Sequence, residues 1–332
     1  MMDFKNVIGH EQVIEHMQNA IKYKKVSHAY ILNGEEGTGK KLLANIFAKA
    51  LQCHQEDDTD SCGTCTSCLQ ADSGNHPDIK YITHEKISIG VDDIREQVNN
   101  DIGIKPYSSQ YKIYIVDDAD KMTEQAQNAI LKTIEEPPVY GIIILLTDNL
   151  NQLLPTILSR CVTLNLKPVR TDMIKDYLMT EYKIPDYMAE LSASFCQGNV
   201  GKAIKYASSE EFLKIKEEVL HLLRYIEEME FYEIIDAIKS ISVNKLEIND
   251  YLDLIMLWYR DILMFKVTKN PNLLLFKEEY KYISNQASMR DYEGIENIIN
   301  AIDKAKIRLK ANVNFDIAIE LMLLTLKENA ND

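Results

Sequence analysis

Seven consecutive residues near the amino terminus form a pattern that binds phosphate. The run Gly34-Glu35-Glu36-Gly37-Thr38-Gly39-Lys40 follows an apolar segment and opens a helical pattern, which is the setting of a phosphate-binding loop, or P-loop. The glycines let successive backbone N–H groups converge on phosphate oxygens, the helix N-terminus adds positive potential, and the lysine reaches the terminal phosphates. The predicted phosphate-binding residues are Gly34, Gly37, Thr38, Gly39 and Lys40.

The same pattern lacks a residue that an ATPase needs for Mg²⁺. Its eighth position calls for a Ser or Thr hydroxyl, but Lys41 stands there, and an ammonium has no lone pair to give a metal. A later core strand leads into Asp117-Asp118. Asp117 is available for the metal, whereas Asp118 replaces a glutamate with a shorter side chain, and a displacement of about 1 Å can cost roughly 10²-fold in rate. We expect ATP and Mg²⁺ binding to be weak or absent; the alternative is that these aspartates only solvate a strand end.

Four of the six cysteines are clustered in a spacing that suits a metal. Cys53, Cys62, Cys65 and Cys68 follow the pattern C-x8-C-x2-C-x2-C, and small residues between them allow tight turns. Four thiolates with no place for water form a closed, tetrahedral, structural zinc site. We therefore predict one zinc ion in a module of residues 53–68. The alternatives are that His54 replaces one sulfur, or that four unrelated thiols are simply buried.

The elements that must position these residues alternate between short apolar runs and helical patterns. This alternation predicts an α/β domain whose parallel sheet is flanked by helices. A helix face from Leu42 to Leu51 follows the P-loop, and a second helix carries Ala126, Ala129, Ile130 and Ile134 and stops at Pro137-Pro138. The predicted strands are Ala29 to Leu32, Lys112 to Val116, Ile142 to Leu146 and Val162 to Leu166.

Strand signals fade after residue 167, and helical patterns replace them. Three short ones run from Thr171 to Ala207, broken at Ile184-Pro185 and Gly198-Asn199. Longer amphipathic segments follow, which a helical bundle packs most simply. They include Glu217 to Ile238, Tyr251 to Phe265 and Ile295 to Leu309. We therefore predict an α/β domain over residues 1–167, a small helical domain over 168–207 and an all-α bundle over 208–332.

Composition limits the kinds of partner. The 332-residue chain has a formal net charge of −14, so the whole molecule repels a polyphosphate backbone, and tight independent DNA binding is not expected. Its apolar runs are far shorter than the roughly 20 residues that span a bilayer, and the amino terminus shows no export signal. We expect a cytoplasmic protein with no membrane partner, in a reducing compartment where clustered thiols hold metal.

Several of these segments together resemble one family, the AAA+ clamp-loader subunits of bacterial DNA polymerase III. The resemblance rests on the P-loop, the four-cysteine insertion after its helix, and three further runs. It implies an AAA+ fold for the first domain, a lid for the small helical domain and a ring-forming collar for the bundle. The three runs are Val7 to His10, Asn128 to Pro138 and Leu154 to Cys161.

The resemblance also assigns roles to single residues. Within the family, gamma/tau subunits hydrolyse ATP and delta-prime subunits do not. Gly201 falls where active members carry a phosphate-sensing arginine, so that Lys41, Asp118 and Gly201 are three departures that resemble the delta-prime type. Arg160, inside a Ser-Arg-Cys motif, is the arginine that the family projects onto a neighbouring subunit's ATP. Thr147 matches a polar sensor position, although a strand-end hydrogen bond is its other reading.

These implications predict a non-hydrolysing accessory subunit of the polymerase holoenzyme. It would bind the delta and gamma/tau subunits and present Arg160 in trans. It would support loading of the sliding clamp onto primed DNA, and would contact the clamp and the DNA only indirectly, through the complex. One alternative is a catalytically active gamma/tau-type ATPase with unusual residues. Another is a zinc-dependent nucleic-acid-binding module, which the net charge opposes.

Overall fold

The computed structural model describes residues 3–55, 59–83, 88–243, 247–311 and 313–328. The chain separates into two compact units, Met1–Ile204 and Lys205–Asp332, and each is described by itself. The predicted domain limits at 167 and 207 remain predictions. None of the described helices has the length and apolar character needed to cross a membrane.

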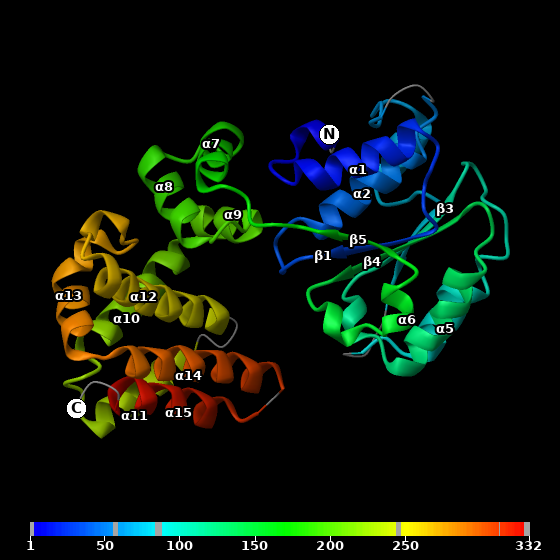
Figure 1. Ribbon diagram of the computed structural model, residues 1–332. Coiled ribbons are helices and arrows are strands. Elements are labelled where there is room, and N and C mark those ends of the chain that lie inside the picture. Colours follow the sequence, from blue (N-terminus) through cyan, green and yellow to red (C-terminus); the bar gives the residue numbers. More distant parts are fainter. Residues whose placement is uncertain (1–2, 56–58, 84–87, 244–246, 312, 329–332) are drawn as a thin grey trace. The chain divides into compact units, whose positions relative to one another are not determined.

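The first unit contains a five-stranded sheet in which every pairing is parallel. Its order is β2-β3-β4-β1-β5, so the P-loop strand β1 lies between β4 and β5 (Figure 1). Parallel strands bring their carboxyl ends to one edge of the sheet, where ligands of α/β proteins usually bind. The strands are β1 (Ala29–Asn33), β2 (Ile79–Ile82), β3 (Lys112–Val116), β4 (Gly141–Thr147) and β5 (Val162–Asn165).

Helices cover both faces of this sheet (Figure 1). On one face, α1 (Glu11–Lys22) and α2 (Lys40–Leu51) bury Met17, Leu43 and Phe47 against the strands. On the other, α4 (Val91–Ile94) and α5 (Glu124–Glu135) do the same with Ile94 and Ile130. Because both faces are covered, the strands are continuous apolar runs. The predicted α/β class is confirmed.

Short elements complete the first unit. The three helical patterns predicted beyond residue 170 are confirmed as α7, α8 and α9, with breaks at the predicted places. The edge strand β2 is an element that the sequence reading did not predict. The remaining elements are η1 (Phe4–Asn6), α3 (Thr66–Asp72), η2 (Arg95–Asn99), η3 (Ala119–Lys121), η4 (Leu150–Gln152), α6 (Pro155–Leu158), α7 (Thr171–Glu181), α8 (Asp186–Phe195) and α9 (Val200–Ser208).

Helices are the only regular elements in the described part of the second unit, as predicted. The predicted continuous segment Glu217 to Ile238 is wrong, because a turn at residues 226–230 divides it into two helices. Glu227 leaves the helical path there and its Oε1 lies 2.8 Å from Nη2 of the buried Arg290. The elements are α10 (Glu210–Tyr225), α11 (Phe231–Val243), α12 (Ile248–Thr268), η6 (Pro271–Leu273), η7 (Lys277–Glu279), α13 (Tyr280–Met289), α14 (Tyr292–Lys310) and α15 (Phe315–Glu328).

Candidate functional site

The P-loop joins β1 to α2 at the carboxyl edge of the sheet. Gly37 and Gly39 have φ angles of 85° and 94°, a left-handed conformation that glycine adopts without the steric cost of a side chain. Gly39 then caps the amino end of α2. The structure therefore forms the strand, loop and helix arrangement that the pattern requires for phosphate binding.

Lys40, the lysine of the phosphate motif, is bound to its own loop. Its Nζ donates hydrogen bonds to the carbonyl oxygens of Gly34, at 2.5 Å, and Glu35, at 3.0 Å. These two carbonyl oxygens engage N–H donors of Lys40 that a nucleotide phosphate would need. The loop is thereby held together by contacts within the chain.

Lys41 and Asp117, predicted as opposing parts of a defective metal site, form an ion pair with each other. The Nζ of Lys41 lies 3.0 Å from Oδ2 of Asp117. The second carboxylate, on Asp118, is paired with Lys121 at 2.6 Å. Each aspartate of the predicted metal edge therefore faces an ammonium of the same chain.

Gly201 at the start of α9 makes direct backbone contact with the P-loop. Its N–H donates to the carbonyl oxygen of Gly37 at 2.9 Å, and the Asn199 side chain donates to Glu36 O at 2.7 Å. A Cβ added at position 201 would lie 2.7 Å from Gly37 O and 2.8 Å from Gly37 Cα. No side chain fits at position 201 without a shift of the backbone, so the packing requires glycine there. Glycine also cannot supply the positive charge of the phosphate-sensing arginine named above.

Thr147, at the end of β4, is buried, with 1% of its surface exposed. Its hydroxyl donates to Asp120 Oδ1 at 3.0 Å and accepts the N–H of Asn149 at 3.1 Å. These are hydrogen bonds of the kind expected at a strand end. The O–H donor of Thr147 is therefore already engaged by a residue of the same chain.

A cavity of about 510 Å³ opens beside the P-loop. Its apolar lining comes from α2, α7, α9 and the segment before α1, and its polar lining includes backbone of the P-loop. A cavity of this size and mixed lining can take a small organic ligand. The lining includes Val7, Ile8, Gly37, Thr38, Leu42, Ile46, Tyr177 and Ile204.

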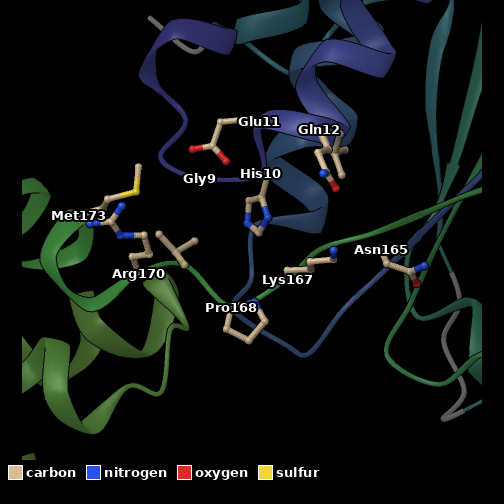
Figure 2. Close-up of a pocket in the computed structure, with 11 residues that line it drawn as sticks. Gly9, His10, Glu11, Gln12, Asn165, Lys167, Pro168, Arg170 and Met173 are labelled. Carbon is tan, nitrogen blue, oxygen red and sulfur yellow. The ribbon is translucent and has the colours of Figure 1, made fainter.

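His10 ties the segment before α1 to the P-loop. Its Nε2 lies 3.1 Å from the carbonyl oxygen of Thr38, so this nitrogen carries the proton that the carbonyl accepts. Burial lowers the pKa of His10, which favours the neutral ring. Figure 2 shows the ring projecting toward Lys167 and Pro168 in a second cavity of about 430 Å³.

Arg160 follows α6, and its guanidinium is held by three neighbours. Its Nε lies 2.9 Å from Glu135 Oε1, and its Nη1 donates to Thr156 O at 3.1 Å and to Ser159 Oγ at 3.2 Å. The side chain is 42% exposed. The guanidinium is therefore held in place by its neighbours and is also accessible to solvent. Glu135 lies within the run Asn128 to Pro138, and no local pattern indicates its pairing with Arg160.

The four cysteines predicted to bind metal lie together. Their Sγ atoms all fall within 4.8 Å of one another, and those of Cys62 and Cys68 are 3.9 Å apart. Zinc–sulfur bonds of about 2.3 Å in a tetrahedron place sulfurs roughly 3.8 Å apart. The donor set therefore fits one metal ion. The group found among the described residues does not include His54, and residues 56–58 of the module lie outside the description.

Backbone amides prepare these sulfurs to be thiolates. Cys62 N donates to Cys53 Sγ, Cys65 N to Cys62 Sγ, and Cys68 N to Cys65 Sγ, at 3.3 to 3.4 Å. Hydrogen bonds from the backbone of Thr64 and Cys65 lower the pKa of Cys62 to about 6, whereas burial raises the pKa of Cys68. Since metals bind the thiolate, a cation would be needed to ionise the buried member.

The cysteine module also holds the amino terminus. Asp60, only 6% exposed, accepts the N–H of Phe4 at 2.9 Å and that of Ser61 at 2.8 Å. Phe4 is itself buried. The module thus anchors the segment that leads into the cavity lining and His10.

The chain is similar to subunits of DNA polymerase III. Residues 9–170 match the family described as DNA polymerase III, delta subunit. The chain is 31% identical to DNA polymerase III subunit delta' of Bacillus subtilis over 320 residues, covering 96% of both chains. It is 27% identical to subunit tau of the same organism over 99% of its own length but only 63% of tau.

A solved structure supports the fold. The gamma subunit-related protein of DNA polymerase III from Thermotoga maritima aligns with a TM-score of 0.52 and 21% identity, covering 96% of this chain and 99% of that one. At this identity the likeness concerns the fold alone.

Proposed function

The chain belongs to the clamp-loader family of DNA polymerase III subunits, and we propose that it acts there as a delta-prime-type subunit that does not hydrolyse ATP. It would assemble with delta and gamma/tau subunits and support ATP-dependent loading of the sliding clamp onto primed DNA. Similarity to a delta' subunit over nearly the whole of both chains supports this assignment. Residues 1–167, 168–207 and 208–332 would be its AAA+ domain, lid and collar.

The ion pair between Lys41 and Asp117 is the observation that carries the proposal. In an active P-loop site, a hydroxyl at position 41 and the carboxylate of Asp117 would share a Mg²⁺ ion. Here the ammonium stands 3.0 Å from that carboxylate. A divalent cation at this place would be repelled by the ammonium of Lys41. It would also lack the hydroxyl ligand, so Mg²⁺-dependent hydrolysis is disfavoured for two reasons.

Arg160 is the part of the chemistry that the chain would contribute to a neighbour. A guanidinium is permanently charged and can stabilise the charge on a phosphoryl group in transfer. Arg160 is accessible and ordered, as an arginine acting across a subunit boundary must be. In its own chain it would serve no hydrolytic site.

We further propose that the bound metal is a single zinc ion with a structural role, held by Cys53, Cys62, Cys65 and Cys68. Four sulfur ligands leave no position for water, and zinc is the usual ion of such closed sites.

The rival function is an active gamma/tau-type ATPase. It is favoured by the seven retained positions of the P-loop motif and by the similarity to tau. Reconstitution separates the two. In a complex of this chain with delta and gamma/tau subunits, clamp-stimulated ATPase should depend on Arg160 of this chain but tolerate Lys40→Ala, because only the first would take part in hydrolysis.

Arg160→Ala should silence one ATP site in that complex. An arginine finger raises kcat at its site roughly 10³-fold or more. The total ATPase rate of the complex should therefore fall by at least the fraction of the rate that this site supplies. Arg170→Ala is the matched control, since Arg170 is also exposed and paired with an acid, Asp172. Full ATPase activity in a complex shown to contain the Arg160→Ala chain would contradict the role in trans.

A further inference from the structure

Glu135 stands at a place where helix electrostatics disfavour an acid. It is the last residue of α5, and the C-terminus of a helix carries partial negative charge that repels a carboxylate. Glu136 adds a second carboxylate one residue later. Departures from local rules that have an evident partner commonly mark functional sites. The partner of Glu135 is Arg160, at 2.9 Å.

Stability does not account for this pair. Both side chains are 42% exposed, and ion pairs in contact with water contribute little to folding. The geometry of the guanidinium gives another reason. Glu135 contacts Nε, and Thr156 and Ser159 accept hydrogen bonds from Nη1, while within the described residues Nη2 makes no hydrogen bond.

We propose that Glu135 is a positioning residue for Arg160. It fixes the guanidinium from the Nε side so that Nη2 is left to meet the phosphate oxygens of a nucleotide on a neighbouring subunit. This inference rests on the proposed function of Arg160 in trans. A long, flexible side chain that is ordered before assembly loses less freedom on docking, and a catalytic group displaced by about 1 Å can lose roughly 10²-fold in rate.

The test uses the reconstituted complex with Glu135→Ala and Glu135→Gln. Loss of the anchor should lower the rate at the one site that Arg160 serves about threefold to tenfold. The total kcat for clamp-stimulated ATP hydrolysis should therefore fall, but by no more than Arg160→Ala removes, with KM for ATP within about twofold, since ATP binds mainly to the neighbour. Glu135→Gln retains an oxygen acceptor and should keep most of the rate. Glu136→Ala is the matched control on the same helix end and should match the unaltered complex. Equal losses for Glu135→Gln and Glu135→Ala would overturn the positioning role.

A double variant separates this inference from the proposed function. If Glu135 acts through Arg160, the Glu135→Ala/Arg160→Ala complex should have the same rate as Arg160→Ala alone. An additional loss in the double variant would overturn the inference. If Arg160→Ala lowers the rate and Glu135→Ala does not, the inference alone fails. If Arg160→Ala has no effect, the proposed function in trans fails first.

Discussion

Two places in the described part of the chain differ in how they meet a cation: at one of them a side chain of the protein supplies the positive charge. At the P-loop edge, the ammonium of Lys41 lies 3.0 Å from Asp117, in the part of the site where Mg²⁺ would belong. At the cysteine cluster, four sulfurs lie within 4.8 Å of one another and offer ligands to a cation that must come from outside.

On the proposed function, this difference shows how a P-loop site would lose its ATPase chemistry and keep its fold. Lys40 binds the carbonyls of its own loop, and Gly201 packs its backbone on Gly37, so the loop has partners without ATP. At the cysteine cluster, the described backbone N–H groups contact the sulfurs but cannot take the place of a metal ion. We therefore expect ligand removal to matter at the second place and not at the first.

The largest expected effect is at the cysteine cluster. Cys65→Ser should abolish metal binding and lower the free energy of unfolding by on the order of 4 kcal/mol, or Tm by about 8–16 °C. Mass spectrometry of the native protein and a thermal melt measure both. Cys161→Ser, a cysteine outside the cluster, should retain one metal ion per chain. Unchanged metal content in Cys65→Ser would remove the module's proposed role.

A smaller effect is expected from restoring a metal ligand at the P-loop. Lys41→Thr supplies a hydroxyl and frees Asp117, so Mg²⁺ should tighten ATP binding by about tenfold, or ~1.4 kcal/mol, in the variant but not in the unaltered chain. Calorimetric titration with Mg²⁺ or EDTA measures this. Lys121→Thr is the control, because it removes the ammonium beside Asp118 without adding the loop hydroxyl. If ATP binding depends equally on Mg²⁺ in all three chains, Lys41 is not what excludes Mg²⁺ from the P-loop, and the contrast with the cysteine cluster fails.

The smallest expected effect concerns pH and His10. Burial lowers the pKa of His10 in the folded chain, so below its ordinary value the unfolded chain binds the proton more readily. The free energy of unfolding should therefore decrease as pH falls from 7.5 to 5.5. His10→Asn, which tolerates the left-handed φ of 59°, should show a smaller decrease in urea titrations. The same decrease in both chains would show that His10 does not contribute.

Much of this architecture could be predicted from local patterns. The strands of the sheet interior carry long apolar runs, and the cysteine spacing and the P-loop each have a distinctive sequence. The edge strand β2 was missed because it is only four residues long and contains Lys80 beside Tyr81. The break near Glu227 was missed because no Gly or Pro marks it.

The contacts that decide function could not be predicted in the same way. The motifs place Lys41 and Asp117 at one site but do not predict an ion pair between them. Gly37 and Gly201 are far apart in the sequence, and nothing local to either predicts their contact. Sequence reasoning identified Gly201 as a missing arginine. The structure adds that a Cβ there would collide with the P-loop backbone. Likewise, the acid at the end of α5 acquires meaning only beside Arg160.

The central claim is that this chain does not hydrolyse ATP. The most direct measurement is phosphate release from saturating Mg²⁺-ATP by the purified chain alone, compared with its Lys40→Ala variant, which lacks the lysine of the phosphate motif. The two proteins are expected to release phosphate at equal rates. A higher rate for the unaltered chain, lost when Mg²⁺ is removed, would contradict the central claim and identify an active ATPase.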